Sequence, residues 1–278
     1  AGRNSGFMID LPHDLTSANY GGGLDADLDQ TQDNRLGITH ASEMATEYHL
    51  SNEAFSLCGK INGAATAKGR AHNKNFAKHL TAMGEPYESF DTQQMREITG
   101  SSYYQGGLYT PGTAMIQPAM YIRGVADGLR QDGVTIYENS PVTALNNDGN
   151  WVAETPQGQV SSSHVILAVN GHINSFGYAK SRLMHVFTYA SMTRALTPQE
   201  IGKLGGNPVW GLTPADPVGT TVRRISGTGG DRLIIRNRFT FDPTLEVNPK
   251  RIAKIGNDHD TSFLHRFPDL SNVTMEYR

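Results

Sequence analysis

The run from His164 to Val169, with the sequence HVILAV, constrains the fold of this chain more than any other segment. It is almost entirely apolar, which is the pattern of a central strand buried on both faces. A strand of that kind needs other strands beside it and helices to cover the sheet. It would end at Asn170-Gly171, where the backbone can turn sharply or come close to a ligand.

A helix is predicted ahead of this strand. Pro118 can begin it, because the N–H that proline lacks would have no partner in the first turn, and Gly133 can end it. Between them, four apolar residues recur at helical spacing: Ile122, Val125, Ala126 and Leu129. We expect this stripe to pack on the sheet that contains residues 165–169.

Periodicity, cap residues and turn residues predict the remaining elements. Further helices are expected over about 36–54, 70–83, 91–98 and 249–267. Strands are expected over 57–66, 134–137, 141–145, 151–155, 158–160, 184–195, 208–213, 219–226, 231–238 and 273–277. The sequence GTGG at 227–230 predicts a hairpin turn. An acidic patch, Asp25, Asp27, Asp29 and Asp33, is expected to be solvated coil.

Composition excludes several classes of protein. The 278 residues carry a net charge of −3, which gives no electrostatic reason to expect a nucleic-acid or anionic-membrane partner. No apolar run approaches the ~20 residues that cross a bilayer. The single cysteine, Cys58, fits a reducing compartment, so we expect a cytoplasmic protein. The ten histidines show no metal-ligand spacing, no metal is expected, and His259 between Asp258 and Asp260 is expected on a solvated surface.

Four motifs occur in an order that resembles the FAD-dependent oxidoreductases of the D-amino-acid oxidase, glycine oxidase and sarcosine oxidase type. The likeness is greatest to gamma-glutamylputrescine oxidase-like proteins, and it covers nearly the whole chain. The opening AGRNSG resembles the family's G-A-S-G-R-N-G-G loop, and the stretch from Pro118 to Val142 its helix and GV-x-I-x-E-x-x-x-V strand. Residues 151–171 resemble its W-x-V-x-T…VVLA-x-G run, and 231–235 with 267–270 resemble its rear part.

The resemblance implies an α/β (α+β) fold with two lobes. An FAD/NAD(P)-binding Rossmann-like lobe would comprise residues 1–82, 112–182 and 249–278, and a substrate lobe with a mixed or antiparallel sheet residues 83–111 and 183–248. The family's first βαβ unit, with its G-x-G-x-x-G, is not found in the sequence. We therefore expect the nucleotide-binding lobe to be incomplete.

The same resemblance implies a non-covalent FAD site. Its loop under the flavin ring would be Gly2, Arg3, Asn4, Ser5 and Gly6. Val142 would bind the adenine edge through its main chain, and Ala168 and Gly171 would pass near the pyrophosphate or ribose. The residues alone also allow a purely structural interpretation. The loop would be a frayed terminus, Val142 an ordinary strand residue, and the segment from Ala168 to Gly171 the end of a buried strand.

The resemblance implies oxidation of a C–N bond in a small amine or amino acid, by hydride transfer to flavin. No catalytic side chain is assigned, and a homo-oligomer would be compatible with the outer strands. Four arginines on predicted strands are candidates to hold a substrate carboxylate: Arg223, Arg224, Arg236 and Arg238. The alternative hypothesis is a truncated, inert scaffold that does not hold FAD.

Overall fold

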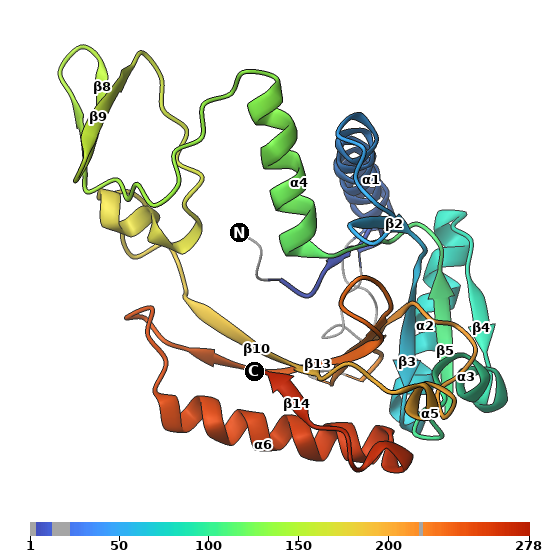
Figure 1. The fold of residues 1–278 in the computed structure, drawn as a ribbon. Helices are drawn as coiled ribbons and strands as arrows, with labels where there is room; N and C mark the ends of the chain where they lie inside the picture. The colour runs from blue at the N-terminus through green and yellow to red at the C-terminus, as the bar shows by residue number, and fades with distance from the viewer. Residues whose placement is uncertain (1–3, 13–22, 217–218) are drawn as a thin grey trace. The chain divides into compact units, whose positions relative to one another are not determined.

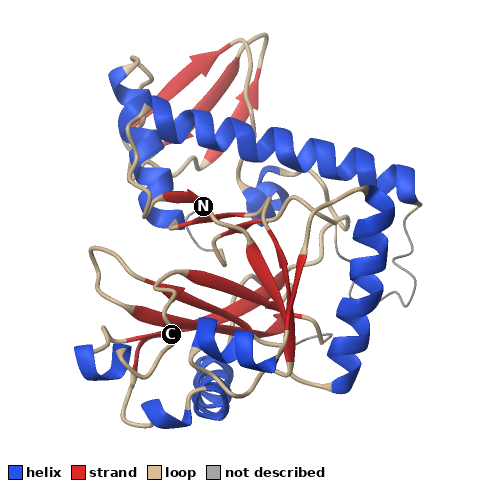
Figure 2. Ribbon diagram, turned by 90° about the vertical axis from the view of Figure 1, so that its right-hand side faces the viewer, coloured by secondary structure: helices blue, strands red, loops and turns tan. Residues whose placement is uncertain are grey.

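The structure is a computed structural model that describes residues 4–12, 23–216 and 219–278. Helices and mixed sheets confirm the α/β class (Figure 2). The chain forms two compact units. The larger unit comprises Ala1–Gly128, Thr188–Phe239 and Asn248–Arg278, and the smaller unit Leu129–Phe187 and Thr240–Val247. Which residues serve a cofactor and which a substrate stays a prediction.

An eight-stranded sheet dominates the larger unit, with the order β14-β10-β13-β12-β11-β3-β5-β4 (Figure 1). Strands β11 and β3 pair in parallel, while β12 pairs antiparallel with both β11 and β13. The bounds are β3 (Lys60–Ala64), β4 (Glu88–Phe90), β5 (Gly106–Thr110), β10 (Val186–Thr193), β11 (Trp210–Pro214), β12 (Thr221–Ile225), β13 (Arg232–Phe241) and β14 (Met275–Tyr277). These strands confirm the β-rich rear part and the predicted hairpin turn between β12 and β13.

One face of this sheet is buried under helix α6 (Pro249–Arg266), which lies along β10 and β13 in Figure 1. Phe263 of α6 belongs to one core cluster with Leu212, Val222 and Leu233. The short helix α3 (Thr92–Thr99) adds Met95 to this cluster. Its ends were predicted from local signals, since Asp91 caps the first turn and Gly100 takes the left-handed conformation.

Helix α2 (Ala67–Met83) agrees with its prediction, whereas α1 (Leu24–Glu47) begins twelve residues earlier and ends seven residues earlier than expected. The expectation of an acidic coil was therefore wrong. Asp25 and Asp27 lie in the first turn of α1, where carboxylates interact favourably with the positive end of the helix dipole. Among the described residues, no helix combines the length and apolar character that a membrane span requires.

A three-stranded sheet with the order β1-β6-β2 pairs the start of the chain with later segments. Its strands are β1 (Phe7–Met8), β2 (Phe55–Leu57) and β6 (Ala114–Ile116). The remaining short elements of the larger unit are α5 (Pro198–Ile201) and the 3₁₀-helix η2 (Pro268–Leu270). The chain after β1 is held by the fully buried Asp10.

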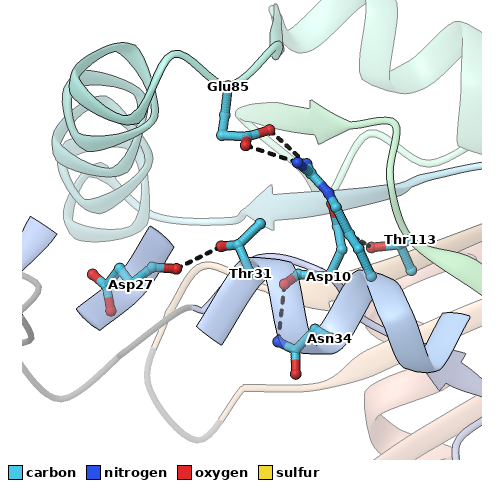
Figure 3. A network of polar contacts seen from close by, with 7 residues as sticks. Asp10, Asp27, Thr31, Asn34, Glu85 and Thr113 are labelled. Carbon is cyan, nitrogen blue, oxygen red and sulfur yellow. Dashed lines mark hydrogen bonds and ion pairs between the residues drawn. The ribbon is translucent and has the colours of Figure 1, made fainter. Parts of the chain in front are cut away.

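Asp10 is the centre of a polar network (Figure 3). Its Oδ2 accepts from Nε and Nη2 of Arg35, at 3.3 and 3.0 Å, and its main-chain oxygen accepts from Nδ2 of Asn34 at 2.9 Å. Arg35 also pairs with Glu85, with 2.9 Å between Nη1 and Oε1, and Thr113 Oγ1 donates to Asp10 at 3.4 Å. The network thus ties the chain after β1 to α1, to the loop after α2 and to the turn before β6.

Helix α4 (Pro118–Gln131) has the predicted beginning, but its packing face was predicted wrongly. Ile122, in the expected stripe, is 43% exposed. The helix instead packs through its glycines, because a Cβ on Gly128 would lie 2.1 Å from the ring of Tyr48 and one on Gly124 would lie 2.3 Å from Leu50. The residues that follow α1 therefore decide which face of α4 is buried.

Adding one methyl group at Gly128 is expected to destabilise the larger unit. Gly128→Ala gains about 1 kcal/mol of helix propensity, but overpacking against Tyr48 costs about 1–3 kcal/mol. The matched control is Gly37→Ala in α1, where no atom lies within 4 Å of the added carbon and where we expect a gain of about 1 kcal/mol. Urea unfolding should show opposite signs for the two variants, and a stabilised Gly128→Ala would contradict this packing.

The smaller unit contains the predicted antiparallel meander, β7 (Ala144–Asn147), β8 (Trp151–Thr155) and β9 (Gly158–Ser162). Two other predictions were wrong, since neither 134–137 nor 164–169 is a strand. Ile166 is 92% exposed, and a 3₁₀-helix, η1 (Asn170–Phe176), follows. An apolar run becomes a buried strand only where neighbouring strands pair with it, and in the described part of the chain none pairs with this run.

Candidate functional site

The loop that the resemblance places under a flavin is described from Asn4 onward; Gly2 and Arg3 lie outside the described residues. Gly6 is buried with φ +74°, a left-handed conformation that favours glycine. Its N–H donates to Oδ1 of Asn4 at 2.7 Å, which closes a small turn around Ser5. The loop therefore has a defined shape set by its own polar side chain.

Arg223 of β12 fixes this loop from the sheet side. Its Nη1 donates to three main-chain oxygens, those of Ser5 at 2.9 Å, Gly6 at 3.1 Å and Ile116 at 3.0 Å. A Cβ on Gly6 would lie 1.9 Å from this Nη1 and 2.5 Å from the oxygen of Ile116. The guanidinium thus brings together the start of the chain, the end of β6 and the centre of the large sheet.

Arg223 carries its charge in a dry environment. The residue is 6% exposed, and burial lowers its pKa to about 10, so it stays protonated at neutral pH. The guanidinium lies over the ring of Phe7, 5.3 Å from its centroid. Its Nε is buried without a hydrogen-bond partner among the described residues. A buried donor without a partner is unfavourable and marks a place for an acceptor.

The other three candidate arginines differ from Arg223. Arg224 is buried on the opposite face, where it donates to the oxygens of Gly205 and Asn207 and pairs with Asp231. Arg238 pairs with Asp258 on the surface. Arg236, on β13, is half-buried. The structure therefore gives Arg224 and Arg238 roles in holding the fold.

Lys60, at the start of β3, is another buried cation, which the sequence analysis did not single out. It is 2% exposed, and its Nζ donates to Oδ1 of Asn62 and, at 3.4 Å, to Oγ1 of Thr213. Burial lowers its pKa to about 8, an effect that the nearby Asp10 partly opposes. The sequence contained one indication of this burial, because Lys60 begins a strand, KINGA, whose other residues are mostly small or apolar.

Replacing this buried ammonium is expected to change the pH dependence of stability. Because the folded-state pKa lies below the ordinary 10.5, the unfolded chain binds the proton more tightly, and stability falls as pH falls from 10.5 through 8. Between pH 10 and pH 7 the parent should lose roughly 2–3 kcal/mol relative to Lys60→Met. Urea melts at both pH values measure this, with the exposed Lys74→Met as control. Parallel pH profiles for parent and Lys60→Met would contradict it.

A cavity of about 240 Å³ adjoins these residues. Cys58, Lys60, Met115, Trp210 and Gly211 are among the residues that line it. Nε1 of Trp210 is buried without a partner in the described chain. Burial raises the pKa of Cys58, so its thiol stays protonated and is a poor nucleophile. The cavity is large enough for a small organic molecule.

The remaining candidate residues lie in the smaller unit. Val142 is 41% exposed in the segment before β7, and no described residue engages its main-chain N–H or C=O. Ala168 is exposed, and Gly171 lies in η1, where an added Cβ would be 3.0 Å from Nδ1 of His185. The buried strand end predicted around Ala168 is therefore not formed, and the roles of these three residues stay predictions.

His259 is buried rather than solvated, which corrects the expectation for 258–260. Its Nδ1 is 2.7 Å from Oγ of Ser191, and its Nε2 is 3.3 Å from the oxygen of Asn237. Burial lowers the pKa of the imidazole. The neutral imidazole of His259 can therefore hydrogen-bond to both Ser191 and Asn237. Because Ser191 lies on β10 and Asn237 on β13, these bonds join α6 to both strands, and this serine–histidine pair holds the fold together.

Comparison with known proteins relates the chain to flavoproteins. The sequence model of the FAD dependent oxidoreductase (DAO) family matches residues 1–278. The probable oxidoreductase OrdL of Rhizobium meliloti (strain 1021) is 27% identical over 215 residues, which are 73% of this chain and 49% of that protein. The gamma-glutamylputrescine oxidoreductase of Escherichia coli (strain K12) is 33% identical over 86 residues, 31% of this chain and 20% of that protein. The chain thus spans about half the length of OrdL.

Among solved structures, the glycine oxidase of Geobacillus kaustophilus is similar in fold, with a TM-score of 0.68 and 17% identity. The match covers 98% of this chain and 69% of that chain. These comparisons confirm the resemblance drawn from the four motifs.

Proposed function

This chain belongs to the FAD dependent oxidoreductase family, and we propose that it serves to oxidise a C–N bond in a small amine or amino acid. The relative named for gamma-glutamylputrescine supports an amine-type substrate. The observation that carries the proposal is the tight turn at Gly6, held by the buried Arg223 in the loop that resembles the flavin loop of the family.

Three features of the chain fit a flavin. Gly6 keeps the loop in a compact left-handed turn, with its open side filled by Nη1 of Arg223, so that a narrow main-chain segment is available to lie under a ring. Arg223 holds a positive charge beside the loop, with a donor left without a partner. In the smaller unit, the main-chain groups of Val142 are free to bind an adenine edge. FAD, when bound, supplies the acceptor for the hydride that leaves the substrate carbon.

The residues of the chain then contribute binding and electrostatics. Asn4 and Gly6 fix the loop, and the Arg223 charge favours negative charge that develops near it in a site shielded from water. We propose that FAD is held non-covalently, because the thiol of Cys58 is half-buried and protonated. No side chain is assigned as general base.

We further propose that the face of the large sheet opposite α6 is the substrate side. Side chains alternate along β12, so Arg223 points away from the face on which Val222 contacts the α6 core. On β10, which is separated from β12 by β13, Ala190 of the same face is exposed, which leaves room for a ligand.

The single cysteine of the chain supports a further proposal, that the protein works in a reducing compartment such as the cytoplasm.

A visible absorption spectrum of the purified full-length protein tests the proposed function. We expect flavin bands that bleach when an amine or amino-acid substrate is added without oxygen. Bands that no member of an amine and amino-acid panel bleaches would contradict C–N oxidation. A colourless protein that cannot be reconstituted with FAD would favour the inert-scaffold hypothesis instead.

The proposed adenine contact at Val142 predicts an unusual pair of mutants. Val142→Ala keeps the main-chain N–H and should leave FAD affinity nearly unchanged. Val142→Pro deletes that donor, and the loss of one such bond costs about 1–3 kcal/mol, or roughly ten- to a hundredfold in affinity. Titration of the apoprotein with FAD measures both variants, and equal affinities would count against the contact.

A further inference from the structure

A small pocket lies where three elements of the larger unit meet: the end of α3, the loop after α5 and the end of α6 (Figure 1). Each element contributes one cationic side chain to its wall, namely Arg96, Lys203 and Arg266. Asp269 is the one acidic residue among the described residues that line it. Because the chain as a whole carries a net charge of −3, this excess of positive charge is local.

None of these three cations forms an ion pair with a carboxylate of the described chain. Lys203 instead donates its Nζ to the main-chain oxygen of Asp269 at 2.8 Å. The hydroxyl of Tyr104, near Arg266, supplies no negative charge, since burial raises its pKa to about 12. Arginines that do pair with carboxylates are frequent elsewhere in the structure: Arg35, Arg130, Arg194, Arg224, Arg232, Arg238 and Arg278. A bound anion would relieve the repulsion among the three cations of the pocket.

Arg266 is the buried and rigid part of this pocket. The residue is 7% exposed, and its Nη1 donates to the main-chain oxygen of Ser262 at 2.8 Å and to Oγ of the same residue at 2.7 Å. Its guanidinium lies over the ring of Tyr103, 4.2 Å from the centroid. In the described chain, its Nε and the hydroxyl of Tyr104 are buried without hydrogen-bond partners. The guanidinium is therefore held in place before any ligand binds, with donors to spare.

The size of the pocket restricts the ligand. Its volume is about 40 Å³, and because a water molecule needs about 10–15 Å³, it holds about three groups of that size. Arg96, Ser102 and Lys203 at its rim are exposed, so the rest of a larger ligand would lie in solvent. Cations from three elements suit a tetrahedral oxyanion, whereas a planar carboxylate is matched by a single guanidinium.

We propose that Arg96, Lys203 and Arg266 form a binding site for a phosphate group, either inorganic phosphate or the head of a phosphomonoester. Arg266 ends α6, the helix that covers one face of the large sheet, whereas Arg223 holds the loop at Gly6 from the opposite face. The phosphate site thus lies away from the side that we propose for flavin and substrate, and this inference does not depend on the proposed function.

Calorimetric titration of the full-length protein with inorganic phosphate, in the presence of FAD and at constant ionic strength, tests the site. We expect saturable binding at one site per chain, with competition by sulfate, which has the same tetrahedral shape. Absence of saturable binding would overturn the proposal. A second titration with glycerol phosphate separates the two sources. An affinity at least equal to that of phosphate indicates a phosphomonoester, and binding of inorganic phosphate alone indicates the free ion.

Variants locate the binding. Arg266→Met removes charge-assisted hydrogen bonds and should weaken phosphate binding about ten- to a hundredfold. The double variant Arg96→Met with Lys203→Met changes only exposed side chains, so it should fold like the parent and bind about three- to tenfold more weakly. Lys74→Met, exposed on α2 and outside the pocket, is the control and should leave the affinity unchanged. Parental affinity in the double variant, or an equal loss in Lys74→Met, would refute the assignment to this pocket.

Discussion

Gly6→Ala is expected to lower the free energy of unfolding by about 3–5 kcal/mol. The new Cβ would lie 1.9 Å from Nη1 of Arg223 and 2.5 Å from the oxygen of Ile116, and the residue would also have to hold φ +74°. The left-handed conformation costs about 1–2 kcal/mol, and the clash adds the rest by moving a buried guanidinium off its three acceptors.

Gly84→Ala provides the control for the backbone part of this effect. Gly84 follows α2 with the same φ of +74°, but no atom lies within 4 Å of its added Cβ. We expect it to lose only about 1–2 kcal/mol in urea unfolding. If Gly6→Ala lost no more than Gly84→Ala, then Arg223 would not hold the loop as described. Under the proposed function, Gly6→Ala should also weaken FAD binding.

The second large effect is expected at the Asp10 network. Arg35→Met removes the charged partner of the fully buried Asp10 carboxylate; because the Arg35 side chain is itself 44% exposed, we expect a cost of about 1–3 kcal/mol, that of leaving a buried polar group without its partner. The same change also removes the pair with Glu85. Because this network ties the chain after β1 to α1, the region around Phe7 and Gly6 should become more accessible.

The free energy of unfolding in urea, with amide exchange of the first twelve residues, measures both consequences. Arg278→Met is the matched control, since Arg278 and Asp260 form an ion pair in which both side chains are about 40% exposed. Such a surface pair contributes only about 0–1 kcal/mol. Similar losses for the two arginine variants would show that the burial of Asp10 carries no energetic weight.

The candidate site could be predicted only in part. Resemblance pointed to the loop at Asn4 to Gly6, and arginines on strands were recognised as candidates. Four were equivalent in sequence, and only the three-dimensional arrangement separated Arg223 from Arg224, whose neighbours on the opposite face include Asp231. Lys60 was not found, because a lysine within a short strand gives no local sign of its burial.

Elements with strong local signals were fixed by the sequence itself. Asp91 and Gly100 delimit α3, Pro118 begins α4, and a glycine-rich turn separates β12 from β13. Caps, turns and periodicity act over a few neighbouring residues, so their effect can be read without the rest of the chain.

The tertiary structure decided what depends on distant partners. The apolar run at 164–169 is not a strand, because a strand needs hydrogen bonds from other strands and the described chain supplies none to it. The buried face of α4 was set by Tyr48 and Leu50 rather than by its own apolar stripe. Arg223 donates hydrogen bonds to the main-chain oxygens of Ser5 and Ile116, each of which lies more than 100 residues away from it in the sequence. Spacing along the chain carries no information about such a meeting, because folding alone brings those segments together.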